Sequence, residues 1–281
     1  MTGTVPGVDT SRSFAPTPAR GADERSLQAL WTGSRLQCGR MLRRWVRDPA
    51  TVIQALVYPA VTLVMLHIVL GNRITAATGT PAVYGMVPLV VLIGAMFGSV
   101  VSAVGLRAER ESGLLSRFYT LPTHRAAGLV GRLMAELIRV VVTSLVILAA
   151  GIALGFRFTQ GFGSGLLLLV VPLGFGLGFA LMVTFLATLS TRLPLVELVS
   201  TIATLLMFFN SGFVPVMAYP RWLQPFVEHQ PMSCAIDTMR ALAEGGELAR
   251  PLLETVAWSV GMIAVFAVPA ARGYRRAAEN G

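Results

Sequence analysis

Six stretches of this chain are apolar and almost free of charged residues over the length that a membrane span requires. A helix rises about 1.5 Å per residue, so each stretch can cross the roughly 30 Å of hydrocarbon in a bilayer. Spanning segments of this length form helices, because lipid offers no partner for backbone amides. The sequence therefore predicts an all-α polytopic membrane protein with spans at about 50–70, 83–106, 133–154, 165–189, 194–214 and 252–271.

The distribution of arginine predicts how these spans are oriented. All 23 residues counted as lysine or arginine are arginine, and the formal net charge is +9. With the N-terminus inside, the inner segments carry 17 arginines, the outer loops carry five, and one lies within the third span. Cytoplasmic loops are enriched in basic residues, so both termini are predicted to be cytoplasmic, in a protein of the cytoplasmic membrane. The charge is thus a topology signal, and nucleic acid is not an expected partner.

The segment before the first span divides into two parts. Residues 1–25 are polar and contain several prolines and glycines, which is typical of a disordered cytoplasmic tail. Residues 26–281 form the predicted six-helix domain, which opens on a helical stripe of apolar residues with arginines opposite. This pattern predicts an amphipathic interfacial helix in the lipid headgroup layer, and a helix of a soluble bundle is the alternative. Its apolar face is marked by Leu27, Trp31, Met41 and Trp45.

The inner loop at 105–133 is the most charged stretch between two long apolar segments. A short amphipathic helix is predicted within it, because four apolar side chains fall within an arc of about 120° at 100° per residue. These side chains are Leu114, Leu115, Phe118 and Leu121. Such a helix beside a membrane is suited to docking a soluble partner, and an ordinary interfacial loop helix is the alternative.

The outer loop at 215–251 mixes apolar and aromatic residues with prolines. A solvated loop does not need these apolar side chains, whereas short helices that dip back into the outer leaflet do. The sequence therefore predicts a re-entrant outer loop before the last span, with a small folded outer cap as the alternative. The residues that define this loop are Pro215, Trp222, Pro225, Pro231, Asp237 and Arg240.

The side-chain inventory excludes several chemistries. Without lysine the chain can form neither a Walker A phosphate loop nor a Schiff base. The two cysteines and three histidines are scattered, so no disulfide framework or metal site is expected. Glu136 and Arg139 lie three residues apart in the third span and are predicted to form a structural pair. We predict no catalytic, cofactor-binding or metal-binding residue, and we do not expect an enzyme.

Several motifs point to a known family. The inner loop reads RAERESGLLSRFYTLP, and the outer segment contains SGFVP, YPRWLQP and DTMRA, at residues 107–122, 211–215, 219–225 and 237–241. Together with the six spans and the interfacial helix, these motifs resemble the permease subunit of ATP-binding-cassette exporters of the type-two permease family. The resemblance covers nearly the whole chain after about residue 26.

Two further segments suggest a branch of this family. VRDPATVIQALVYP at 46–59 and GFRFTQG at 155–161 are similar to the daunorubicin-resistance type. Within that type they resemble most the mycobacterial branch associated with export of phthiocerol dimycocerosate lipids. Ser116 and Arg117 depart from the acidic or apolar residues that many relatives carry in the inner loop.

The resemblance implies partners as well as a fold. Two copies of a separate ATPase subunit would bind ATP and magnesium, and a second copy of this permease or a sibling permease would complete the transporter among membrane lipids. The cargo would be hydrophobic or amphiphilic, either an antibiotic such as an anthracycline or a complex cell-envelope lipid. The implied ATPase-coupling residues are Glu109, Arg110, Glu111, Gly113, Leu114, Arg117, Phe118, Leu121 and Pro122.

Two other classes of protein are alternatives to a permease. One is a non-catalytic membrane anchoring or assembly protein, which co-purification experiments would distinguish from an exporter. The other is a membrane-embedded lipid-modifying enzyme, which requires His, Asp or Glu residues clustered at one membrane depth. The sequence shows no such cluster.

Overall fold

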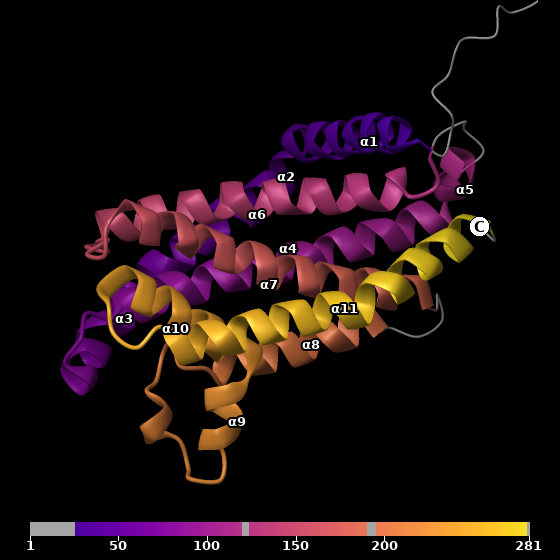
Figure 1. The fold of residues 1–281 in the computed structure, drawn as a ribbon. Helices are drawn as coiled ribbons and strands as arrows, with labels where there is room; N and C mark the ends of the chain where they lie inside the picture. Colours follow the sequence, from indigo (N-terminus) through magenta and orange to yellow (C-terminus); the bar gives the residue numbers. More distant parts are fainter. Residues whose placement is uncertain (1–25, 120–123, 190–194, 280–281) are drawn as a thin grey trace, which may run out of the picture.

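The computed structural model describes residues 26–119, 124–189 and 195–279 as helices joined by turns (Figure 1). The predicted tail, residues 1–25, lies outside the described residues. The elements in chain order are α1 (Leu27–Arg47), α2 (Pro49–Val52), the π-helical turn η1 (Ile53–Val57), α3 (Tyr58–Thr78), α4 (Val83–Glu111), α5 (Leu114–Tyr119), α6 (Ala127–Ala153), α7 (Phe162–Leu189), α8 (Leu195–Phe208), the 3-10 turn η2 (Val216–Ala218), α9 (Gln224–His229), α10 (Pro231–Glu244) and α11 (Ala249–Glu279). The described chain is all-α, as predicted.

Five helical segments among the described residues are long and apolar enough to cross a membrane. They are Pro49–Thr78, which comprises α2, η1 and α3, together with Val83–Glu111, Ala127–Ala153, Gly163–Leu189 and Ala249–Glu279. The protein is therefore a multi-pass membrane protein.

The predicted span at 194–214 coincides with α8, a shorter apolar helix among the described residues that directly follows 190–194, which lie outside them. Helix α8 ends at Phe208, before the end that hydropathy predicts. The chain turns directly afterwards, where the backbone N–H of Gly212 donates to Asn210 Oδ1 at 2.7 Å. Hydropathy alone did not reveal this turn, because the residues on either side of it are apolar.

Helices α4 and α7 form the centre of the bundle. In the most apolar 18-residue stretch of each of these helices, 56% of the residues are buried. The corresponding share is 11% in Pro49–Thr78 and in α11. Helix α7 approaches α11 closely because a Cβ on Gly178 would lie 2.9 Å from Met262 Cβ. Small residues permit such helix contacts in membranes. The first span and α11 thus present apolar side chains outward, as expected for helices that face lipid or a partner subunit.

Helix α1 runs along the start of α6 (Figure 1). The contact uses the small buried residues of α1, which are Gly33, Ser34 and Cys38. A Cβ on Gly131 of α6 would lie 2.7 Å from the backbone oxygen of Ser34, so the two helices touch nearly backbone to backbone. The predicted amphipathic helix is present. The structure adds that the middle of its stripe packs on α6, while Leu27 and Trp31 remain exposed.

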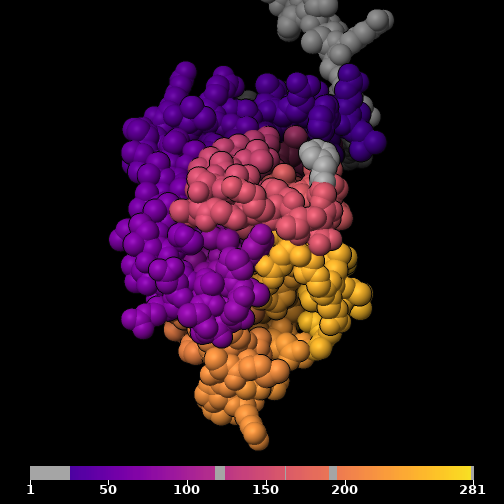
Figure 2. Space-filling model, turned by 90° about the vertical axis from the view of Figure 1, so that its left-hand side faces the viewer, coloured from indigo at the N-terminus to yellow at the C-terminus, as the bar shows by residue number. Residues whose placement is uncertain are grey.

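The segment before α11 folds back onto the bundle as α10. Its side chains Ile236 and Met239 are fully buried, and the helix packs against α4, α7 and α11 at the end of the bundle opposite α5 (Figure 1). By contrast, η2 and α9 project from the body of the molecule (Figure 2), and Trp222 between them is 79% exposed. The predicted re-entrant loop therefore consists of one buried helix and one projecting segment.

Candidate functional site

The short helix α5 stands at one end of the bundle and is joined to α4 by a turn. Gly113 makes this turn with a φ of +68°, a conformation that favours glycine. Leu115 is 3% exposed and belongs to the apolar core of the bundle, and α5 packs against α11 and α4. Among the α5 side chains that the structure describes, Leu115 is therefore the buried one.

The other predicted coupling residues of this segment are placed as follows. Leu114 is half-buried and Arg117 is exposed on α5. Phe118 lies in the same helix, one turn after Leu114. Leu121 and Pro122 lie outside the described residues. The described part of α5 therefore offers an apolar and a basic side chain outside the core.

Two arginines fasten the end of α4 to neighbouring helices. Arg110 donates from Nη1 to the backbone oxygen of Thr188 in α7 at 3.2 Å. Arg107 pairs with Glu111 one turn later at 3.1 Å and with Glu197 of α8 at 3.4 Å. The end of α4 that carries α5 is therefore linked to the ends of α7 and α8.

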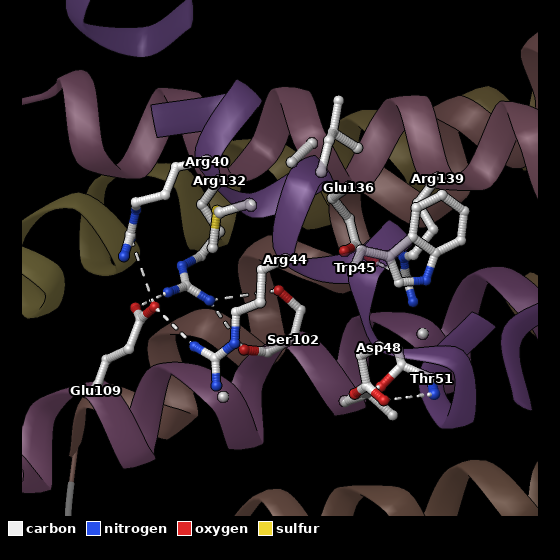
Figure 3. A pocket seen from close by; sticks show the side chains of 16 residues that line it. Arg40, Arg44, Trp45, Asp48, Thr51, Ser102, Glu109, Arg132, Glu136 and Arg139 are labelled. Carbon is white, nitrogen blue, oxygen red and sulfur yellow. Dashed lines mark hydrogen bonds and ion pairs between the residues drawn. The ribbon is translucent and has the colours of Figure 1, made fainter. Parts of the chain in front are cut away.

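Glu109 is the exception in this charged segment, because it is only 7% exposed. Its carboxylate pairs with Arg132 of α6, and with Arg40 at 3.5 Å and Arg44 at 3.7 Å from α1 (Figure 3). Arg132 also donates from Nη1 to the backbone oxygen of Ser102 in α4 at 3.0 Å. One carboxylate thus holds three helices together directly beside the predicted coupling segment.

A second charged pair lies further along α6. Glu136 pairs with Arg139, as predicted, and it accepts a hydrogen bond of 2.6 Å from Ser99 Oγ of α4. Gly98 makes room for the arginine, because a Cβ there would coincide with the Arg139 guanidinium at 1.7 Å from Nη1. The pair is therefore bound between α4 and α6, and the glycine opposite it leaves space for the guanidinium.

These two charged groups line one cavity of about 220 Å³ between α1, α4 and α6 (Figure 3). Met41 and Trp45, which were predicted on the apolar face of α1, line this cavity, and Asp48 and Thr51 also line it. The Thr51 hydroxyl and backbone N–H donate to Asp48, and these hydrogen bonds hold the pKa of the Asp48 carboxyl below its usual value. Asp48 is therefore an anion at neutral pH.

At the opposite end, Asp237 and Arg240 of α10 form an ion pair at 3.2 Å. Arg240 also donates from Nη2 to the backbone oxygen of Ser211 at 2.8 Å, and so ties α10 to the turn after α8. The remaining predicted residues of this loop mark its boundaries. Pro215 precedes η2, and Pro225 and Pro231 stand in the first turns of α9 and α10.

Sequence reasoning did not find the three-helix cluster around Glu109. The family resemblance grouped Glu109 with the other implied coupling residues and gave no indication that its carboxylate is buried. A signal was present, since Glu109 and Arg132 are charged residues close to the ends of two apolar spans. Their pairing could not be inferred without knowing that α4 and α6 are neighbours.

The long apolar helices, the interfacial α1, the short α5 and the folded-back α10 together define a multi-pass membrane transport subunit. The sequence pattern of the family described as ABC-2 type transporter matches residues 36–243. This match covers most of the chain, and the chain belongs to that family. The resemblance drawn from the motifs is thereby confirmed.

Individual relatives agree with this assignment. The chain is 43% identical over 272 residues to the probable doxorubicin resistance ABC transporter permease protein DrrC of Mycobacterium tuberculosis, covering 96% of this chain and 99% of that protein. It is 27% identical over 268 residues to the daunorubicin resistance ABC transporter permease protein DrrB1 of Streptomyces coeruleorubidus, covering 95% and 92% of the two chains. The doxorubicin resistance permease DrrB of M. tuberculosis is 30% identical over 193 residues, covering 64% and 65%.

Proposed function

We propose that this permease subunit exports a hydrophobic or amphiphilic compound, driven by a separate ATPase subunit that docks on α5. Two ATPase copies would bind ATP and magnesium, and a second permease, identical or sibling, would complete the pathway in the cytoplasmic membrane. The observation that carries the proposal is the attachment of α5. Helix α5 packs against α11 and buries Leu115, while Leu114 and Arg117 lie outside the core.

The location of α5 supports a role in transmission. A displacement of α5 would be transmitted to α4 through the turn at Gly113 and to α11 through the packing around Leu115. It would also be transmitted to α1 and α6 through the ion pairs of Glu109. In this proposal Leu114 and Phe118 contact the ATPase, and Arg110, Glu111 and Arg117 fix the register of docking. Glu109 does not contact the ATPase in this proposal. It contributes by holding α1 and α6 to α4.

The double variant Leu114→Ala with Phe118→Ala tests this docking role. These residues are four apart and share one face of α5, so losing both should remove the apolar contact with the ATPase. We expect cargo-stimulated ATP hydrolysis by the assembled transporter to fall at least about tenfold, while the permease still folds. The matched control is Leu253→Ala with Val260→Ala, two exposed apolar residues on α11. Unchanged stimulated hydrolysis in the α5 variant, with normal assembly, would disprove the docking role.

The class of cargo follows from the relatives and from the helices. The relatives are named for doxorubicin and daunorubicin resistance, which supports an amphiphilic drug as cargo. The spans contain few charged residues, so they offer little to a small ion or a sugar. A complex envelope lipid is the second candidate. A deletion strain that accumulates doxorubicin favours the drug, whereas one that lacks a surface lipid but still synthesises it favours the lipid.

The proposed orientation places α5 and both termini in the cytoplasm. Single cysteines introduced at exposed positions test it, because the native Cys38 and Cys234 are buried. In intact cells, Met217→Cys should react with a membrane-impermeant maleimide, and Leu36→Cys should react only after the membrane is opened. The reverse pattern would refute the orientation.

Co-purification distinguishes the exporter from its alternatives. An exporter subunit should bring down a nucleotide-binding ATPase, and an anchoring protein should not. A lipid-modifying enzyme would need clustered ligands or acids, and no group of three or more His, Cys, Asp or Glu residues that could hold a metal occurs among the described residues.

A further inference from the structure

A second cavity lies between the ends of α4, α7 and α11, at the same end of the bundle as α5 (Figure 1). Its volume of about 410 Å³ falls within the roughly 300–1,000 Å³ of pockets that enclose small organic molecules. Three arginines line it, Arg110 from α4 and Arg272 and Arg276 from α11, and its lining among the described residues includes no carboxylate. The lining of this cavity therefore carries three positive charges.

The end of α7 brings these arginines together. Arg110 donates from Nη1 to the backbone oxygen of Thr188 at 3.2 Å. On the α11 side, a Cβ on Gly273 would collide with the hydroxyl of the same Thr188, so the backbone beside Arg272 touches this residue. Arg276 lies one turn after Arg272, at a spacing that places both on one face of α11. The three arginines are therefore gathered around the end of α7.

The arginines of α11 have no carboxylate of their own. Neither Arg272 nor Arg276 makes a hydrogen bond or an ion pair within the part of the chain that the structure describes. Glu279, on the same helix, pairs with Arg275 at 2.8 Å. Residues 190–194, which follow α7 and lie outside the described residues, contain no acid. Like charges that share a cavity repel one another, so an anion bound between them would be favoured.

The face of α11 that carries these arginines is apolar on its membrane side. Val265, Val268, Arg272 and Arg276 recur at intervals of three and four residues, which is one helix face. The two valines are 62% and 52% exposed, and the predicted span at 252–271 ends directly before the first arginine. This face is thus apolar within the hydrocarbon and basic at its border. An anionic phospholipid has the same order, with acyl chains first and a phosphate at their end.

We propose that this cavity binds the headgroup of an anionic membrane phospholipid. The phosphate would face Arg272 and Arg276, with Arg110 adding to the positive potential, and the acyl chains would lie along Val265 and Val268. Basic pockets between membrane helices bind anionic headgroups in this way. The lipid would be a bound constituent of the permease, distinct from the cargo.

The first test measures lipid binding by purified permease in detergent. Phosphatidylglycerol should raise the melting temperature and be retained in native mass spectra, more strongly than phosphatidylcholine. The double variant Arg272→Gln with Arg276→Gln should bind it at least roughly tenfold more weakly, because charge-assisted contacts are lost. Both side chains are exposed, so the variant should melt like the wild type without lipid. Equal binding of the two lipids, or full binding by the variant, would contradict the proposal.

Two control variants remove charge outside the cavity. Arg43→Gln with Arg47→Gln changes two exposed residues of α1 that do not line it, and it should leave the affinity for phosphatidylglycerol unchanged. On α11 itself, Arg276→Gln should weaken binding more than Arg275→Gln, because only Arg276 lines the cavity. If the controls lose as much affinity as the cavity variants, the lipid is held by general surface charge, and the proposal is overturned.

An acidic side chain of the ATPase could meet the same arginines, because α5 packs against α11. Co-purification distinguishes this occupant from a lipid. The lipid assignment requires the permease purified alone to bind phosphatidylglycerol through Arg272 and Arg276. If the double variant keeps its lipid affinity and no longer co-purifies with the ATPase, the cavity is a contact with that subunit, and the proposal is overturned.

Inorganic phosphate distinguishes the two possible sources of a small anion. It carries the same charged group without acyl chains, so it should raise the melting temperature much less than phosphatidylglycerol at the concentration at which the lipid saturates. If free phosphate protects as well as the lipid and displaces it, the occupant is a soluble anion, and the assignment to a phospholipid is overturned.

Discussion

The two ends of α4 are held to their neighbours by different chemistry. At the α10 end, α4 packs against backbone: a Cβ on Gly85 would lie 2.4 Å from the backbone oxygen of Gly212, and Met86 and Leu89 are fully buried. At the α5 end, a buried carboxylate, Glu109, is shared among arginines of α1 and α6.

This difference separates a fixed end from an adjustable one. Close packing permits essentially one arrangement, because even one added methyl group causes a clash. Several arginines around one carboxylate can exchange places while the carboxylate stays paired. Conformational changes usually depend on elements with more than one stable packing, so the α5 end is the one suited to respond to a partner. Three stability measurements in detergent test this comparison, from the largest expected effect to the smallest.

The largest effect is expected for Glu109→Gln. The substitution leaves Arg132 buried without its counter-charge, and breaking a buried pair in this way costs about 3–5 kcal/mol of unfolding free energy. Glu111→Gln is the control, because the side chain of Glu111 is 53% exposed and such surface pairs contribute at most about 1 kcal/mol. Similar losses in both variants, measured by denaturant unfolding, would show that Glu109 does not hold the three helices together.

Ile236→Ala tests the buried packing of α10. The side chain is 0% exposed, and truncating a buried isoleucine to alanine costs about 2–5 kcal/mol. Trp222→Ala in the projecting segment should cost less than about 1 kcal/mol, because that side chain is 79% exposed. Thermal unfolding of the two variants gives the comparison. Equal stabilities would mean that α10 is not packed into the bundle.

The smallest effect contrasts two glycines of α4. Gly85→Ala should cost about 1–3 kcal/mol, since the new methyl group meets the Gly212 backbone and the helices must separate. Gly105→Ala meets nothing within 4 Å and should be neutral or stabilising by up to about 1 kcal/mol, because alanine favours the helix. Melting temperatures that shift in the same direction would remove the distinction between a close-packed and an open end.

Much of the fold could be predicted because its cause is local. Apolar length located the five long helices, and helical periodicity located α1 and α5. The Glu136–Arg139 pair could be predicted because both residues stand on one helix. The end of α8 could not, because the turn at 210–212 is set by a hydrogen bond to Asn210 and by one from Arg240, which lies 29 residues after its acceptor Ser211.

The sequence by itself determined the class of protein, the helices and the family, since hydropathy, arginine bias and motifs are properties of contiguous segments. Only the tertiary structure decided that Glu109 is buried among arginines of two other helices and that small residues seat α1 on α6. It alone decided that a cavity lined by charged side chains lies between these helices. The physical reason is that these features depend on which helices are neighbours, and no single helix carries that information.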